Sequence, residues 1–321
     1  MKVGFYLDLR NPEAWARPWS EIYGRGLDLV VEAERLGADM VWLSEHHLFP
    51  DGYLPQPLTM AAAIAARTSR IGIGTAVLLA ALRPPMLVAE EVAVVDQLSG
   101  GRLVLGIGAG YSVPEFEAYA TDISRRYGLT DAAVVEIRRL LDEDVVTPPA
   151  AQRPFPIWLG YQGPQGARRA GRLGVGLLSL DRTLLEPYRE GLLGGGHDPA
   201  SARTGGVLDI VLADDPESAF ATMLPHYAHQ LNSYRHAAVA GTGRPLPKII
   251  TVEKLAGGAE RRQGIPGLRV MTPGEAVAAI HEATADAPVE HVYLWASIAG
   301  MPEALVERHL ELLFTEVAPR L

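Results

Sequence analysis

Short apolar runs alternate with longer amphipathic stretches along most of the chain. The run from Val3 to Leu9 is mostly apolar, and the stretch from Trp19 to Leu36 repeats apolar residues at helical spacing before Gly37. Continuous or period-2 apolar runs predict strands, a period near 3.6 predicts helices, and a glycine often ends a helix. The chain is therefore expected to open with a strand followed by a helix.

The same strand–helix unit recurs along the chain to give eight units. The later predicted strands are near-continuous apolar runs, typical of a parallel sheet whose two faces are covered by helices. They span 40–44, 71–79, 102–107, 156–159, 175–180, 208–212 and 291–295. The helices that follow them span 57–68, 86–98, 131–141, 165–172, 184–192, 216–238 and 302–317. Eight units favour a (β/α)8 TIM barrel, with an open doubly wound sheet as the alternative.

Residues 241–273 interrupt this alternation with glycines, prolines and basic residues. A connection of that length without periodicity is uncommon in a compact domain and is usually functional or disordered. We expect it to join the seventh helix to the last strand, with a short extra strand at 248–252. A single domain over 1–321 with this one irregular insertion then accounts for the chain.

Composition narrows the possible function classes. The 321 residues are 48% hydrophobic, carry a formal charge of -9 and include no cysteine. The lack of cysteine excludes disulfides, thiolate metal sites and a cysteine nucleophile. An acidic balance without a long basic run argues against nucleic acid or an anionic membrane as the main partner. Because we find neither a long apolar span nor a leader pattern, the expected location is the cytoplasm.

The first chemical feature is WLSEHHLF, at the end of the second predicted strand. Side chains alternate along a strand, so Trp42, Ser44 and His46 share one direction, and Val41 and Leu43 share the other. The apolar pair suits the helix-facing side, which leaves His46 pointing toward the barrel mouth. There it could act as a general acid or base, or donate to an anion. A structural role in holding the next loop is the alternative, and no metal site is expected.

Two glycine-rich segments follow the fourth and fifth predicted strands. The first, LGIGAGYSVPEF, has glycines that would let the backbone approach a flat or phosphorylated ligand, although the spacing departs from the dinucleotide fingerprint. The second, WLGYQGPQGARRAGRLG, starts a helix whose free amides could hold a phosphate near Arg168 or Arg169. Relief of crowding at the barrel rim would explain the first segment equally well.

These segments together carry a resemblance to a known family that covers nearly the whole chain in order. VWLSEHHLF, the block RIGIGTAVLLAALRPPMLVAEEVAVVDQLSGGRLVLGIGAGYSVPEF, then PIWLG and VYLWASIAG resemble the bacterial luciferase-like monooxygenases, especially their flavin-using Glu-His-His branch. The resemblance implies a (β/α)8 barrel, usually a homodimer, that uses reduced FMN and O2 to oxygenate a small or medium organic molecule. In that family a separate flavin reductase often delivers the reduced flavin.

The resemblance also implies roles for individual residues. His46 matches the catalytic histidine of the family, and Thr75, Ala76 and Val77 match the strand tip where the family has a non-proline cis peptide under the flavin ring. The other implied cofactor-binding residues follow the fourth and fifth strands. They are Gly108, Ala109, Gly110, Tyr111, Arg125, Arg126, Gly160, Tyr161, Gln162 and Gly163.

Two positions depart from the pattern of the family. Luciferases carry a phosphate-binding arginine where Ala109 stands, so Arg125 or Arg126 would take more of that role. Many relatives have Gly-Gly-Ser or Gly-Gly-Thr at the fifth strand tip, where this chain has GYQG. Two alternatives therefore stay open. One is a deazaflavin (F420)-dependent oxidoreductase that transfers hydride, and the other is a non-catalytic flavin-binding or accessory subunit.

Overall fold

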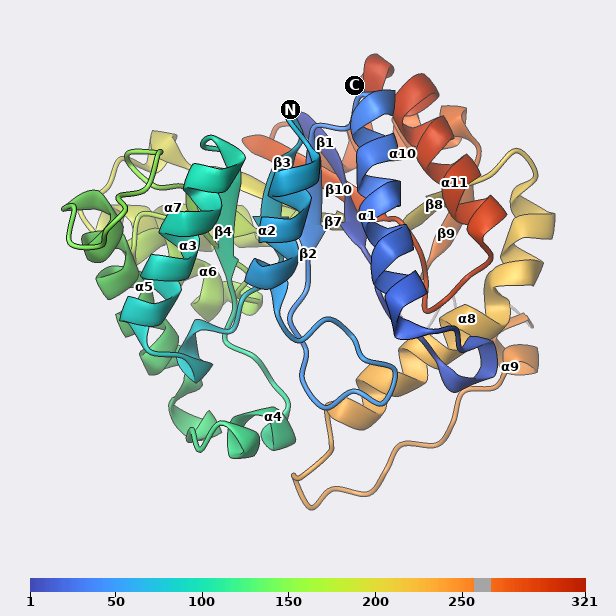
Figure 1. The fold of residues 1–321 in the computed structure, drawn as a ribbon, viewed down its shortest axis with the longest axis horizontal. Helices are drawn as coiled ribbons and strands as arrows, with labels where there is room; N and C mark the ends of the chain where they lie inside the picture. Colours follow the sequence, from blue (N-terminus) through green and yellow to red (C-terminus); the bar gives the residue numbers. More distant parts are fainter. Residues whose placement is uncertain (257–266) are drawn as a thin grey trace.

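Eight parallel strands form a closed barrel in this computed structural model, which describes residues 1–256 and 267–321 (Figure 1). The strands neighbour one another in the order β1-β10-β7-β6-β5-β4-β3-β2, so the first and last strands pair and close the sheet. They are β1 (Lys2–Leu7), β2 (Met40–Leu43), β3 (Gly72–Thr75), β4 (Leu103–Ile107), β5 (Ile157–Leu159), β6 (Gly176–Leu178), β7 (Thr204–Leu208) and β10 (Val289–Trp295). The predicted (β/α)8 barrel is confirmed.

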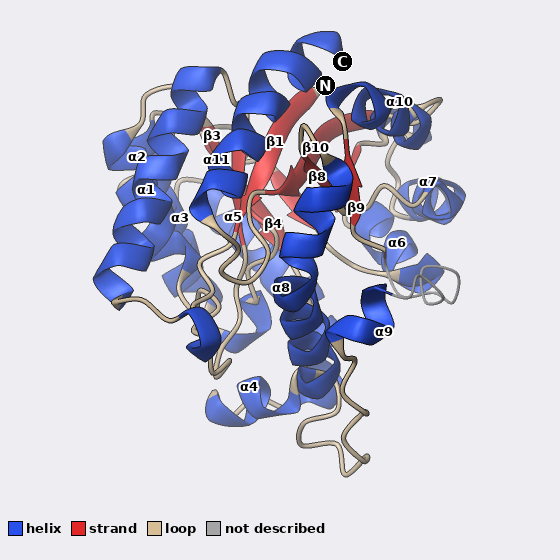
Figure 2. Cartoon of the chain, turned by 90° about the vertical axis from the view of Figure 1, so that its right-hand side faces the viewer, coloured by secondary structure: helices blue, strands red, loops and turns tan. Residues whose placement is uncertain are grey.

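Helices surround the barrel (Figures 1 and 2). The longer ones are α1 (Trp19–Leu36), α2 (Pro57–Arg67), α3 (Pro85–Ser99), α5 (Arg126–Asp142), α6 (Gly163–Arg172), α7 (Leu185–Gly194), α8 (Pro216–Ala237), α10 (Pro273–Thr284) and α11 (Glu303–Leu312). Two short helices, α4 (Val113–Ala118) and α9 (Val252–Ala256), lie within connections. Over the described residues, no helix combines the length and the apolar character that crossing a bilayer requires.

The strand predicted at 208–212 is present in part, but its place as the seventh strand of the barrel is wrong. The barrel strand is β7, and β8 (Ile210–Leu212) leaves the barrel to pair with β9 (Arg269–Met271) in a separate two-stranded sheet. The two glycines of β7 interrupt the apolar pattern that predicts a strand. At one of them, Gly205, the neighbouring strand leaves no room for a side chain. A Cβ atom at Gly205 would lie 2.9 Å from the Cβ of His291 on the neighbouring strand.

The extra strand predicted at 248–252 is also wrong. Residues 248–251 are irregular, and α9 begins at Val252. The Asn232 side chain accepts from the backbone N–H of Ile250 and donates to its carbonyl, both at 2.9 Å. These bonds satisfy the backbone without a strand partner. Part of the predicted irregular segment, residues 257–266, lies outside the described residues.

Large aromatic side chains fill the barrel interior against glycines on neighbouring strands. A Cβ atom at Gly74 would lie 2.4 Å from the Trp42 ring, and one at Gly176 would lie 2.3 Å from the Trp158 ring. Trp42 belongs to the core inside the barrel, whereas Val41 belongs to the core between the strands and the helices. This confirms the alternation of side chains that was expected along the second strand. Because the interior is packed, chemistry is left to the strand ends.

The C-terminal ends of the strands face the lower side of Figure 1. Helix α4, the C-terminal part of α8 and the segment between α8 and α9 gather on that side, and the view turned by 90° agrees (Figure 2). Both chain termini lie at the opposite end of the barrel. The loops after the strands therefore build one mouth, where the predicted site residues are expected to meet.

Candidate active site at the barrel mouth

His46 lies just beyond the end of β2, among four aromatic rings. Its ring centroid is 4.6 Å from that of Tyr53, 4.8 Å from Phe49, and 5.9 Å from both Tyr111 and Tyr234. The side chain is 14% exposed, and its Nδ1 is buried without a hydrogen bond. An imidazole with an uncommitted nitrogen at this position can serve as a general acid or base.

The neighbours of His46 fix the tip of the strand. The buried Glu45 accepts from His47 Nε2 and from Arg83 Nη2, each at 2.8 Å, through its Oε1. Its Oε2 accepts the backbone N–H of Leu79 at 2.8 Å. These bonds join the β2 tip to the segment after β3, so Glu45 and His47 hold the turn from which His46 projects.

A second buried carboxylate, Glu115 on α4, contacts the same tip. Its Oε1 accepts the backbone N–H of His47 at 2.8 Å and lies 3.4 Å from His46 Nδ1. Its Oε2 is buried and makes no hydrogen bond. The sequence pattern did not single out this residue, although it lies inside the glycine-rich segment after the fourth strand. A glutamate in an amphipathic helix gives no sequence signal of burial.

The tip of β3 carries the three residues that the family resemblance singled out. Thr75 is fully buried, and its Oγ1 donates to the Gly106 carbonyl at 2.7 Å and accepts the Gly106 N–H at 3.0 Å. The Ala76–Val77 peptide bond is cis, as the resemblance led us to expect. The two hydrogen bonds between Thr75 and Gly106 join β3 to β4 directly below the mouth.

Glycines bring three neighbouring strand tips together around Val77. A Cβ atom at Gly108 would lie 2.1 Å from Val77 Cγ2, and one at Gly160 would lie 2.6 Å from Val77 Cγ1. Gly110 has a φ of 70°, which disfavours any other residue. Ala109 between them is buried. The predicted residues after β3, β4 and β5 therefore do meet, with Tyr111 reaching His46.

Arg126 is better placed than Arg125 to hold a phosphate beside the fifth strand tip. Its guanidinium lies 4.6 Å from the Tyr127 ring, and that ring lies 5.4 Å from the ring of Tyr161. Its Nε is buried without a hydrogen bond. Arg125 is exposed. Of the two arginines considered, Arg126 is thus the one whose buried donor still lacks an acceptor.

Arg168 and Arg169 of α6 are engaged elsewhere. Arg168 forms an ion pair with Glu190 at 2.7 Å, and Arg169 forms one with Asp131. Asp131 also accepts from the Tyr161 hydroxyl at 2.9 Å, and burial raises the pKa of that phenol. Gln162 is exposed. At Gly163, with a φ of 71°, a Cβ atom would meet nothing within 4 Å, so the start of α6 is open.

A buried arginine that no sequence motif marks lies beneath the aromatic rings. The Arg10 guanidinium is 4.8 Å from the Tyr53 ring, and its Nε donates to Asp51 Oδ2 at 2.7 Å. His229 Nε2 lies 2.8 Å from the same oxygen. Burial alone would raise the pKa of Asp51, but the hydrogen bond from His229 and the charge of Arg10 outweigh it and lower that pKa.

The phenols around His46 keep their protons. Burial raises the pKa of Tyr111, and it raises the pKa of Tyr53 and Tyr234 well above the ordinary value. The hydroxyls of Tyr53 and Tyr234 lie 2.6 Å apart. The mouth therefore presents neutral hydroxyl donors rather than phenolates.

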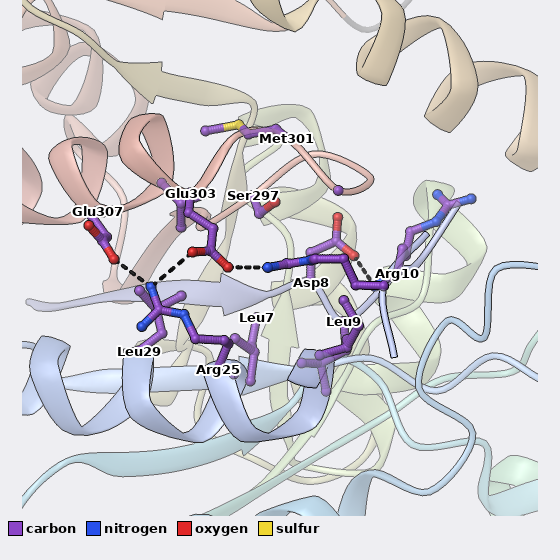
Figure 3. Close-up of a pocket in the computed structure, with 15 residues that line it drawn as sticks. Leu7, Asp8, Leu9, Arg10, Arg25, Leu29, Ser297, Met301, Glu303 and Glu307 are labelled. Carbon is purple, nitrogen blue, oxygen red and sulfur yellow. Dashed lines mark hydrogen bonds and ion pairs between the residues drawn. The ribbon is translucent and has the colours of Figure 1, made fainter. Parts of the chain in front are cut away.

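A pocket of about 70 Å³ lies beside this mouth, between β1, α1 and α11, and Arg10 is one of the residues that line it (Figure 3). Arg25 crosses it to reach Glu307 at 2.5 Å and Glu303 at 3.3 Å, and Arg17 also pairs with Glu303. These charges satisfy one another. The described residues include no group of three or more histidine or acidic side chains that could hold a metal ion.

Comparison with known proteins gives matches over most of the chain. A family model for luciferase-like monooxygenases matches residues 1–248. An F420-dependent glucose-6-phosphate dehydrogenase of Kineococcus radiotolerans is 33% identical over 231 residues, which cover 62% of this chain and 66% of that protein. The alkanal monooxygenase alpha chain of Photorhabdus laumondii is 32% identical over 131 residues, or 41% of this chain and 36% of that one. The fold resembles monooxygenase RslO1 of Streptomyces bottropensis, with a TM-score of 0.76, 23% identity and 99% of both chains covered.

Proposed function

Because this chain belongs to the luciferase-like monooxygenase family, we propose that it is a flavin-dependent monooxygenase, which uses reduced FMN and O2 to oxygenate a small or medium organic molecule. The observation that carries the proposal is the position of His46, at the C-terminal end of β2 and ringed by aromatic side chains. Catalytic residues of (β/α)8 barrels lie at this face. His46 would move a proton to or from the reacting molecules.

The residues at the strand tips fit an FMN phosphate. Arg126 offers a buried Nε that has no acceptor, and the start of α6 at Gly163 is open. Charged donors and free helix amides are the groups that bind phosphate in proteins. Arg126 would thus take the phosphate-binding role that an arginine at the position of Ala109 has in luciferases. When bound, reduced FMN would supply the electrons that activate oxygen.

The aromatic side chains around His46 support a reaction sheltered from water. Tyr53 is fully buried, and Phe49 and Tyr234 are partly buried. Exclusion of water limits side reactions of reactive species. One of the hydroxyls of Tyr53 and Tyr234 donates to the other, so a single O–H of the pair would be left to donate a hydrogen bond to a carbonyl or hydroxyl of the substrate. Aldehydes and ketones are therefore suitable first probes.

A second candidate is an F420-dependent oxidoreductase that transfers hydride and needs no oxygen. It is supported by the 33% identity to an F420-dependent glucose-6-phosphate dehydrogenase. A non-catalytic flavin-binding or accessory subunit is a third candidate, because Ala109 and the GYQG tip depart from the phosphate-binding pattern.

Oxygen uptake with each reduced cofactor separates these candidates. We expect protein-dependent oxygen consumption with reduced FMN, above the rate of free reduced FMN, and oxygenated product from a panel of aldehydes and cyclic ketones. Hydride transfer between F420 and a substrate without oxygen consumption would instead support the second candidate. Failure of the folded protein to bind either cofactor would support an accessory subunit, and cofactor binding without either reaction would support a non-catalytic flavin-binding subunit.

Replacing His46 with alanine tests the residue that carries the proposal. We expect product formation to fall roughly a hundredfold or more, because general acid–base catalysis contributes at least that much. The urea midpoint of unfolding should change little. The same substitution at the exposed His281 serves as the control. Unchanged turnover in His46→Ala would remove His46 from the mechanism.

The family also leads us to propose a homodimer and a separate flavin reductase as partners. The homodimer is supported by one face of α3, where Leu87, Val94 and Leu98 are 45%, 45% and 55% exposed. Apolar side chains repeated on one face of a helix suit a contact with a second chain. Light scattering measures the mass in solution and tests the dimer.

A further inference from the structure

Two buried polar groups at the mouth lack the hydrogen bonds that buried groups usually make. They are Nδ1 of His46 and Oε2 of Glu115. Glu115 is 0% exposed, and its other oxygen lies 3.4 Å from His46 Nδ1. Unsatisfied buried groups are uncommon in native proteins and often have a functional reason. The pair therefore requires an explanation beyond packing.

We infer that Glu115 is a positioning residue that fixes the tautomer of His46, with the proton on Nδ1 and the lone pair on Nε2. The inference rests on the proposed function of His46. A neutral imidazole carries its proton on one of its two nitrogens. If Nε2 carried it, the Nδ1 lone pair would face a carboxylate oxygen at 3.4 Å, and the two would repel each other. A proton on Nδ1 turns that repulsion into attraction, which burial strengthens.

The surroundings leave His46 as the partner of this carboxylate. Over the described residues, no arginine or lysine forms an ion pair with Glu115, whereas Glu45 at the same tip is paired with Arg83. The backbone N–H of His47 donates to Glu115 Oε1 at 2.8 Å. Because that amide belongs to the residue after His46, it holds the carboxylate in a fixed position relative to the imidazole.

The tautomer decides what His46 can do. Nδ1 is buried and lies 3.4 Å from Glu115, and the side chain as a whole is 14% exposed, so Nε2 is the ring nitrogen left to meet a substrate. With its proton on Nδ1, neutral His46 would offer a lone pair at Nε2 and so accept a proton there. Glu115 would thus make His46 a general base rather than a donor through Nε2.

Nitrogen NMR of the whole protein, labelled with 15N-histidine at a pH where the imidazole is neutral, reads the tautomer directly. The chain has nine histidines, and a His46→Gln sample assigns the resonances of His46. We expect a protonated Nδ1 and an unprotonated Nε2 in the wild type. A wild-type spectrum with the proton on Nε2 would overturn the inference, whether or not any variant folds.

Two variants separate the charge of Glu115 from a general disturbance of the tip. Glu115→Gln keeps an oxygen acceptor but removes the charge, so the share of the tautomer with the proton on Nε2 should rise. Tyr119→Phe is the control. The Tyr119 hydroxyl lies 3.2 Å from Nδ1 of His47, so its loss removes a contact of the neighbouring histidine rather than one of His46. Equal changes of the His46 tautomer in both variants would also contradict the inference.

The spectrum needs no cofactor, so this test and the test of the proposed function can fail separately. If both hold, Glu115→Gln should lower turnover by about tenfold, as loss of an orienting partner commonly does. Tyr119→Phe should keep the wild-type rate. A tautomer that follows the prediction together with no oxygen consumption would reject the monooxygenase and leave the role of Glu115 intact.

Discussion

Arg10 forms a buried ion pair with Asp51, with side chains that are 0% and 4% exposed, and the charge of Asp8 also acts on its guanidinium. Replacing Asp51 with asparagine would leave the guanidinium without its ion-pair partner. Removing one member of a buried pair typically destabilises a protein by about 3–5 kcal/mol. We therefore expect Asp51→Asn to lower the free energy of unfolding by that amount in urea denaturation.

An exposed ion pair provides the matched control for this substitution. Arg308 contacts Asp214 at 2.8 Å, and both side chains face solvent. Exposed pairs contribute little to stability because water and salt screen them. Asp214→Asn should leave the unfolding midpoint nearly unchanged. Comparable losses in both variants would show that burial is not what makes the Arg10 pair matter.

Individual site residues were predictable only where neighbours in sequence carry the pattern. His46 and the glycines after β4 lie in short motifs at predicted strand ends, so the sequence located them. The partners of these motifs come from distant segments. Arg10 and Asp51 are 41 positions apart, His47 and Glu115 are 68 apart, and the paired tyrosines 53 and 234 are 181 apart. Such contacts form only when the barrel closes, and no short sequence pattern shows which distant segments will then meet.

At the scale of elements, helices α6 and α7 pack with their backbones in contact. A Cβ atom at Gly191 would lie 2.4 Å from the Arg168 carbonyl oxygen. Gly191→Ala should therefore destabilise the protein by about 1–3 kcal/mol, as overpacking usually does. At Gly194, near the end of the same helix, an added Cβ would meet nothing within 4 Å. Gly194→Ala should stabilise by up to about 1 kcal/mol.

Thermal unfolding of the two variants measures this difference. The prediction is a fall in the melting temperature for Gly191→Ala and a rise for Gly194→Ala. Changes of the same sign in both would mean that helix propensity, rather than the close approach of α6 and α7, governs these positions.

Among the described elements, the sequence predicted strands well where apolar runs were continuous and failed where glycine or polar residues interrupted them. The strand β7 was missed because two glycines dilute it, and β9 because it is short and lies in the irregular segment. Helix α10 was overlooked although its start carries a capping box, with Thr272 and Glu275 bonding each other's backbone N–H. That signal was present in the sequence and went unused.

For the molecule as a whole, two buried histidines couple stability to pH. His291 lies in the barrel interior, and His309 joins β8 to β10 by accepting from Leu212 N–H at 2.9 Å and donating to the Trp295 carbonyl at 2.8 Å. Burial lowers the pKa of each to about 4. Between about pH 6.5 and 4 the unfolded chain binds more protons than the folded one, so stability falls as pH falls. Each histidine contributes a loss of roughly 3 kcal/mol across that window.

Urea unfolding at several pH values between 4 and 7 measures this slope. His309→Gln keeps an amide acceptor and donor but cannot titrate, so its slope should be shallower than that of the wild type. The same change at the exposed His281 is the control. An equal reduction in both variants would contradict the assignment to the buried site.

The pairing of β1 with β10 has a consequence for how the chain is made. Lys2 faces His291 and Tyr6 faces Trp295 across the seam that closes the barrel. During synthesis, the first strand must wait for the last one, with one hydrogen-bonding edge unpaired. The strand tips that carry His46, Val77 and Gly160 therefore leave the ribosome before the barrel that aligns them can close. Chaperone protection of the nascent chain would matter most in that interval.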